Sequence, residues 1–154
     1  MDDDPYSYRD GLREGVAFLL VDRQGRVLLE CRPDKDGNHT DLFYPSGSIE
    51  RRDHRAGADY REVALLREIG EEFRCAVTVE RVQYLGEVKV PAIGLTFYTY
   101  WITAWSGDPG DWTWEDGAPH ARLRWTGLDE VEHLIPYDSG TEMTDMLRSA
   151  LAVA

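Results

Sequence analysis

Apolar positions along the chain follow two periods, one typical of strands and one typical of helices. Residues 15–21 form an apolar run rich in strand formers, and a turn signal at residues 22–25 precedes a second run at 26–32, which predicts a β-hairpin. Further strands are expected at residues 76–86, 95–105 and 123–126, a short extended piece at 48–50, loops at 33–40 and 106–119, and helices at 59–73, 128–134 and 141–153.

The order of these elements indicates the fold class. Strands and helices mix without a regular βαβ alternation, so the sequence predicts an α/β (α+β) fold in which a mixed sheet lies between helices. The length of 154 residues suits one domain with its own core, and residues 1–12 are a candidate flexible segment at its start.

The helix expected at residues 59–73 has an apolar face. On a wheel at roughly 100° per residue, Glu62, Leu66, Ile69 and Phe73 gather on one side, with Leu65 beside them. This side is predicted to face the core. Ala64 falls on the opposite side, among acidic residues, where it leaves space.

The acidic side of this helix carries the most informative pattern of the chain. Glu68, Glu71 and Glu72 follow Arg67 at a spacing that makes them neighbours on the helix surface. Like charges this close destabilise the fold unless a cation offsets them, and an oxygen-only cluster suits Mg²⁺ or Mn²⁺. The simpler alternative is a solvated helix face, and an ordinary surface ion pair for Arg67.

Charge and composition exclude several functions. A formal net charge of −12 argues against binding to a nucleic-acid polymer, which relies on a basic surface. No apolar run is long enough to span a bilayer, and the start of the chain lacks the pattern of a secretory signal, so a cytoplasmic protein without a membrane partner is predicted. The two cysteines and four histidines show no metal-binding spacing.

Residues 47–75 resemble the signature of the Nudix hydrolase family. That signature reads Gly, five residues, Glu, seven residues, Arg-Glu, an aliphatic residue, any residue, Glu-Glu, any residue, Gly and an aliphatic residue. Here Asp59 stands in for the first Glu, seven residues before Arg67. Eleven residues separate Gly47 from Asp59, so a six-residue insertion is expected within residues 51–57, and Arg74 replaces the second Gly.

The resemblance implies a fold and a metal site. The fold is a Nudix-like α/β/α sandwich, and the reaction is hydrolysis of a diphosphate linkage with divalent metals. The implied metal ligands are the helix carboxylates Glu68, Glu71 and Glu72 together with the carbonyl of Gly47.

The resemblance also implies roles beside the metal. Arg67 would orient the carboxylates and Asp59 would support them, although Asp59 could simply cap the helix. The general base is a helix glutamate or an acidic residue of the later loop, either Glu115 or Asp116, of which we prefer Glu115.

A nucleoside needs an apolar platform. Trp112 and Trp114 lie in the expected loop and Tyr98 and Tyr100 share one strand face, so each pair is a candidate for base stacking. The alternatives are a core position for the tyrosines and an oligomer contact for any of the four. Arg32 is a candidate phosphate ligand.

The leading prediction is a Mg²⁺- or Mn²⁺-dependent pyrophosphohydrolase. Its expected substrate is a nucleoside diphosphate derivative, foremost a (deoxy)nucleoside triphosphate cleaved to monophosphate and pyrophosphate. ADP-ribose, dinucleoside polyphosphates and nucleotide sugars stay open. The rival is a non-catalytic module that binds a nucleotide or a partner protein, and a third possibility is isomerase chemistry on a prenyl diphosphate. A homodimer is possible.

Overall fold

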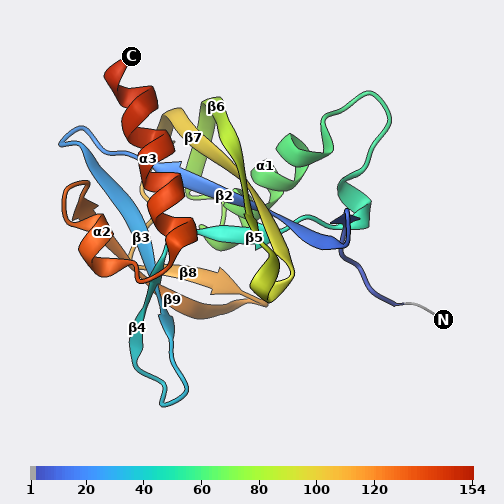
Figure 1. Cartoon of the computed structure of the whole chain (residues 1–154), viewed down its shortest axis with the longest axis horizontal. Helices are drawn as coiled ribbons and strands as arrows, with labels where there is room; N and C mark the ends of the chain where they lie inside the picture. Colours follow the sequence, from blue (N-terminus) through green and yellow to red (C-terminus); the bar gives the residue numbers. More distant parts are fainter. Residues whose placement is uncertain (1–2) are drawn as a thin grey trace.

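The computed structural model describes residues 3–154 (Figure 1). Within this range the chain forms nine strands, three α-helices and two short 3-10 helices. The strands are β1 (Tyr8–Arg9), β2 (Leu12–Leu20), β3 (Arg26–Pro33), β4 (His39–Phe43), β5 (Ser46–Ser48), β6 (Val77–Val90), β7 (Leu95–Gly107), β8 (Trp112–Glu115) and β9 (Ala118–Gly127). The helices are η1 (Arg51–Asp53), α1 (Tyr60–Glu72), η2 (Pro91–Ile93), α2 (Val131–Leu134) and α3 (Asp138–Ala152).

The strands form two sheets. One has the order β1-β2-β7-β6, with β5 also paired to β2, and the other has the order β4-β3-β9-β8. The β2–β7 pair is parallel while the other pairs are antiparallel, so the first sheet is mixed. The α/β fold class is confirmed, with the strands divided between two sheets rather than placed in one.

The predicted hairpin of residues 15–32 is wrong. Strands β2 and β3 lie in different sheets and share only an isolated bridge between Val21 and Val27. The reason is the continuous apolar run in β2, which is buried on both faces and needs partners on both edges. Those partners are β7 on one edge and β1 and β5 on the other.

Helices cover both faces of the sheet that contains β2. Val16, Phe18 and Leu20 pack into a core with α1, whereas Ala17 and Leu19 pack into a second core with α3. Successive residues of a strand point to opposite faces, so one short segment serves both cores. Figure 1 shows α3 across one side and α1 on the other, as the predicted sandwich requires.

Helix α1 begins and ends close to the predicted bounds, but its buried face differs. Ala64 is fully buried, whereas Leu66 is 52% exposed. A small side chain lets the helix approach the sheet closely, so the buried face is turned toward Ala64 and the neighbouring acidic residues. A helical wheel ranks positions by hydrophobicity and contains no information on this close approach.

The expected loop at residues 106–119 contains strand β8 and most of a hairpin. Strands β8 and β9 pair around Asp116 and Gly117, which have φ angles of 51° and 78°. Two consecutive residues with positive φ form the tight turn that an Asp-Gly pair favours in hairpins. The Asp-Gly dipeptide was the signal in the sequence for this turn.

The segment of residues 1–12, a candidate for flexibility, joins the fold in its described part. Tyr6 pairs with Glu50, β1 pairs with β2, and Ser7 is 6% exposed. Residues 1–2 lie outside the described residues. Across residues 3–154, we find no helix with the length and apolar character needed to cross a membrane.

Candidate functional site

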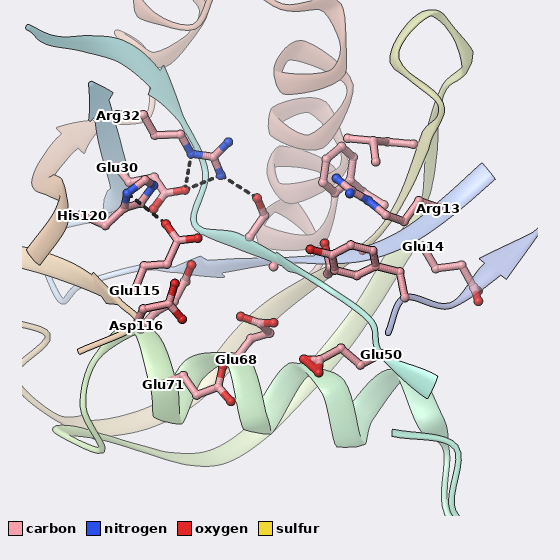
Figure 2. A pocket seen from close by; sticks show the side chains of 18 residues that line it. Arg13, Glu14, Glu30, Arg32, Glu50, Glu68, Glu71, Glu115, Asp116 and His120 are labelled. Carbon is pink, nitrogen blue, oxygen red and sulfur yellow. Dashed lines mark hydrogen bonds and ion pairs between the residues drawn. The ribbon is translucent and has the colours of Figure 1, made fainter. Parts of the chain in front are cut away.

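A cavity of about 490 Å³ lies where α1, β2, β5 and the β8–β9 turn meet (Figure 2). Its walls are mainly polar. The acidic residues that line it are Glu14, Glu30, Glu50, Glu68, Glu71, Glu72, Glu115 and Asp116, and the basic ones are Arg13, Arg32 and His120. The cavity therefore collects carboxylates from separate elements around the predicted helix cluster.

Strand β5 brings Gly47 directly against α1. A Cβ atom at Gly47 would overlap the carboxyl group of Glu68, and a Cβ at Gly15 would lie 3.1 Å from the Gly47 carbonyl oxygen. Only glycine leaves room for the Glu68 carboxyl at this point. The structure thus brings Gly47 and Glu68, two of the residues that the resemblance implies as metal ligands, to one wall of the cavity.

Arg67 connects three segments next to this wall. Its Nε and Nη2 donate to the two carboxylate oxygens of Asp53 at 2.9 and 2.8 Å, and Nη2 also donates to the Ser48 carbonyl at 3.0 Å. Its Nη1 donates to Glu68 Oε1 at 3.0 Å. A bidentate guanidinium–carboxylate pair is both strong and geometrically specific. Arg67 therefore holds the Glu68 carboxyl in place.

Asp53 is the buried partner of Arg67. It is fully buried, and burial raises the pKa of its carboxyl, but the hydrogen bonds from Arg67 lower that pKa below its ordinary value. Burial likewise lowers the pKa of Arg67, and the Asp53 bonds more than reverse this. Asp53 and Arg67 form a charged pair.

The expected supporting role of Asp59 falls to Asp53. Five residues separate Gly47 from Asp53, the spacing of the signature, so the insertion follows Asp53 and occupies residues 54–59. The Asp59 side chain instead caps α1 by accepting a hydrogen bond from the Arg61 backbone at 3.0 Å. Counting forward from Gly47, rather than back from Arg67, was the signal in the sequence.

The helix carboxylates lie in different surroundings. The Glu68 side chain is 12% exposed, and burial raises its pKa to about 7, which Arg67 partly opposes. Burial, followed by repulsion from Glu30 and Glu68, raises the pKa of Glu72 well above its ordinary value. Glu71 keeps a half-exposed side chain. The folded protein is therefore less stable when the two more buried carboxylates, Glu68 and Glu72, are both ionised.

Glu30 is a further buried carboxylate in the cavity. It is 1% exposed, and its Oε1 accepts hydrogen bonds from Nε and Nη2 of Arg32 at 2.8 and 2.5 Å. Arg32 Nη2 also donates to the Ser46 hydroxyl at 2.9 Å, and Arg32, the candidate phosphate ligand, lines the cavity. Glu30 was not among the predicted site residues, although a glutamate within the apolar strand at residues 26–32 was an available signal.

The cavity residues fit a hard divalent cation chemically. Oε2 of Glu72 and Oε2 of Glu30 are both buried and have no hydrogen-bond partner among residues 3–154. Unpaired buried carboxylate oxygens destabilise the fold, and a cation would satisfy them. In the described part of the chain, no three His, Cys, Asp or Glu side chains converge into a preformed metal cluster. The chemical fit therefore rests on these oxygens and on Gly47 beside Glu68.

The β8–β9 turn supplies the opposite wall. Glu115 and Asp116 line the cavity, and Glu115 Oε2 lies 3.0 Å from Nδ1 of His120. Figure 2 shows this pair facing the α1 carboxylates across the cavity. His120 was not predicted, because the pairing register of β8 and β9, which places it beside Glu115, cannot be read from local sequence.

The predicted aromatic platforms lie elsewhere. Tyr98 and Tyr100 are 2% and 3% exposed and belong to the core under α1, where the Tyr98 hydroxyl donates to Glu14. Trp112 and Trp114 lie outside the cavity lining. Their rings contact His39 and Arg122, and Arg74, respectively. Alternation in β7 showed that the tyrosines share a face but not that α1 covers it.

Comparison with known proteins identifies the family. The NUDIX domain family matches residues 11–145, and the chain belongs to that family. Together with this membership, the fold and its structural neighbours define a Nudix-type hydrolase acting on phosphoric anhydrides, the class predicted from the sequence. A comparison with curated proteins finds no significant match.

Solved structures share the fold. A MutT NUDIX hydrolase from Burkholderia pseudomallei is 25% identical, with a TM-score of 0.61 over 87% of this chain and 96% of that one. The NUDIX domain of NrtR from Shewanella oneidensis, solved with ADP ribose, is 18% identical, with a TM-score of 0.65 over 94% and 90%. A structure from a study of MutT from Aliivibrio salmonicida and Vibrio cholerae is 20% identical, with a TM-score of 0.62 over 88% and 97%.

Asp53 and Asp59 should respond very differently to the same substitution. Asp53→Asn removes the charge from a buried pair with Arg67, and we expect the free energy of unfolding to fall by about 3 kcal/mol. Asp59→Asn preserves a good helix cap, so it should change this energy by less than ~0.5 kcal/mol. Urea denaturation of both variants measures the difference. Equal effects would return the supporting role to Asp59.

The buried carboxylates predict a pH dependence for the metal-free protein. The pKa of Glu68 is raised from its ordinary 4.5 to about 7, so its contribution to stability is full below pH 4.5 and is lost as the pH rises through 7. Glu72 acts in the same direction. In EDTA, the free energy of unfolding should fall by roughly 2–3 kcal/mol between pH 5 and pH 8.

Glu68→Gln is the control for this dependence. The amide does not titrate, so the variant should lose much of the decline measured by urea denaturation across the same pH range. A wild-type protein that is as stable in EDTA at pH 8 as at pH 5 would contradict the raised pKa values.

Proposed function

We propose that the chain is a metal-dependent pyrophosphohydrolase that cleaves the diphosphate linkage of a nucleoside diphosphate derivative. The observation that carries this proposal is the pair of unpartnered buried oxygens on Glu72 and Glu30, in the same cavity as Gly47 and Glu68. A structural role alone leaves these oxygens unsatisfied. A bound cation would satisfy them and offset the repulsion between the carboxylates.

The residues that would hold Mg²⁺ or Mn²⁺ are Glu68, Glu71, Glu72 and the Gly47 carbonyl, and the unpartnered Oε2 of Glu30 is an additional candidate ligand. The bound cation supplies neutralisation of the diphosphate and a more acidic water. The chain's own residues fix the site around it. Arg67 holds Glu68 in place through Nη1, and the Asp53 carboxylate holds Arg67. The Glu68 carboxylate would therefore need little reorganisation to bind the metal ion.

Glu115 is our proposed general base. It lines the wall opposite α1, and its carboxylate is 61% exposed, so it can accept a proton from a water in the cavity. The contact of Oε2 with His120 Nδ1 limits the rotamers of Glu115 and leaves Oε1 for this proton. A base must lie on the side of the attacking water, and the cavity provides that position.

The substrate is proposed to extend from the carboxylates toward the N-terminal end of the cavity. Tyr6, Leu95 and Phe97 line that end, and the Arg13 guanidinium lies 4.7 Å from the centre of the Tyr6 ring. We propose these groups, in place of the predicted aromatic platforms, as contacts for the nucleobase of the substrate. Arg32, held by Glu30, remains the proposed phosphate ligand.

The size of the cavity supports a small-molecule nucleotide. A (deoxy)nucleoside triphosphate, cleaved to monophosphate and pyrophosphate, is the proposed substrate, and the likeness to MutT structures supports it. The NrtR domain was solved with ADP ribose, so ADP ribose belongs in the same test.

Glu72→Gln should lower turnover by about 100-fold or more, because it removes a charged ligand from the metal site. The matched control is Glu62→Gln on the exposed side of the same helix, which should leave turnover unchanged. Hydrolysis is measured with nucleoside triphosphates, ADP-ribose, dinucleoside polyphosphates and nucleotide sugars in Mg²⁺ or Mn²⁺.

Three results of this screen would count against the proposal. Near-normal activity in Glu72→Gln would make the ligand assignment wrong. Equal losses in both variants would point to damage to the helix. Absence of turnover, with nucleotide bound tightly, would favour the non-catalytic module.

Glu115→Gln should lower kcat by about 100-fold or more while Mn²⁺ binds with unchanged affinity, because a base accepts a proton without holding the metal. Asp116→Asn on the same turn is the control and should retain most of the activity. Mn²⁺ titration and steady-state kinetics separate the two effects. Unchanged turnover in Glu115→Gln would move the base to a helix carboxylate.

A further inference from the structure

Arg74 adopts a backbone conformation that L-residues rarely adopt. Its φ is 52°, in the left-handed region, directly after the end of α1. The Nudix signature has glycine at this position, and glycine adopts such angles without cost. The chain therefore carries a strained residue where an unstrained one is available, which points to a use for the side chain.

The Arg74 side chain reaches the β8–β9 hairpin. Its guanidinium carbon lies 4.2 Å from the centre of the Trp114 ring, within the range of a cation–π contact. Trp114 is partly buried and belongs to β8, two residues before the turn at Asp116. The contact thus joins the end of the carboxylate helix to the hairpin that forms the opposite wall of the cavity.

Trp114 is the immediate neighbour of Glu115. Because consecutive residues of a strand share a rigid backbone, a shift of Trp114 moves Glu115 with it, and His120 follows through its contact with Glu115. Glu72 lies two residues before Arg74 on the other side of the contact. The Arg74–Trp114 contact therefore links the end of α1, which carries the proposed metal ligand Glu72, to β8, which carries the proposed base Glu115.

We propose that Arg74 is a positioning residue that holds Glu115 in register with the α1 carboxylates by packing on Trp114. The proposal rests on the proposed function in one respect, the role of Glu115 as base. The contact between Arg74 and Trp114, which we call the clamp, concerns only how the hairpin is held against α1. It can therefore be tested without a substrate.

The same hairpin contains an internal comparison. Arg122 lies 5.0 Å from the centre of the Trp112 ring, a similar contact between residues of β9 and β8. It joins two strands that already pair with each other, whereas Arg74–Trp114 joins the hairpin to α1. Arg122→Ala therefore removes a comparable contact without detaching the hairpin from the helix.

Hydrogen exchange tests the clamp. In Arg74→Gly, the backbone amides of residues 114–118 and 120 should exchange about fivefold faster, the loss expected for one exposed cation–π contact. Arg74→Asn, another residue that tolerates positive φ, should do the same, which excludes the added flexibility of glycine as the cause. Arg122→Ala should leave these amides unchanged, and Arg74→Gly should melt at the same temperature or higher, because glycine relieves the strain.

Kinetics test the consequence for Glu115. Arg74→Gly and Arg74→Asn should lower kcat about tenfold with KM within about twofold, because a displaced base slows the chemical step. In a Glu115→Gln background, Arg74→Gly should cause no further loss, since the residue acts through Glu115.

The outcomes separate the two proposals. Unchanged exchange in both Arg74 variants overturns the clamp, whether or not the protein turns over any nucleotide. Faster exchange with an undiminished kinetic effect of Arg74→Gly in the Glu115→Gln background overturns the positioning of Glu115. Full turnover in the Glu115→Gln variant would also overturn the positioning of Glu115, because it would show that Glu115 is not the base. The hydrogen-exchange result would still test the clamp.

Discussion

The bidentate pair between Arg67 and Asp53 is the interaction on which the cavity depends. It joins α1 to η1, and the same guanidinium holds the Ser48 carbonyl of β5 and the Glu68 carboxyl. Three segments therefore meet at one side chain that is only 13% exposed. A buried pair contributes little net stability, but its loss leaves an unpaired charge in the interior, so the position of each segment is enforced by that penalty.

The carboxylates around this pair oppose the stability of the fold. Glu30 and Glu72 each keep a buried oxygen without a hydrogen-bond partner among residues 3–154, and Glu68 and Glu72 repel each other. Such a cluster is tolerated only where surrounding packing is strong, and here it lies beside a sheet with cores on both faces. Stability is thus reduced locally at the proposed metal site, where a bound cation would restore it.

The departures from the Nudix signature have physical counterparts. The six inserted residues follow Asp53, so the Arg67 partner keeps its spacing from Gly47 and the cavity wall is undisturbed. His54, at the start of the insertion, contacts the Ser7 hydroxyl at 2.8 Å and stacks on Tyr60, which ties the inserted loop to the N-terminal segment. Arg74 replaces glycine with a side chain that contacts Trp114 of β8, outside the cavity lining. Each change lies outside the group of residues proposed to hold the metal.

The sequence by itself determined the family, through the resemblance of residues 47–75 to a known signature, the bounds of most elements, and the cluster of carboxylates on α1. This cluster follows from local spacing, since residues three and four apart on a helix are neighbours in any fold. Only the tertiary structure decided that Asp53 rather than Asp59 binds Arg67, that Glu30 and His120 join the cavity, and that Tyr98 and Tyr100 lie beneath α1. Those facts depend on which strands pair and which face a helix covers. The pairing of β2 with β7, 82 residues further along the chain at Val16 and Tyr98, is a long-range contact that local periodicity does not encode.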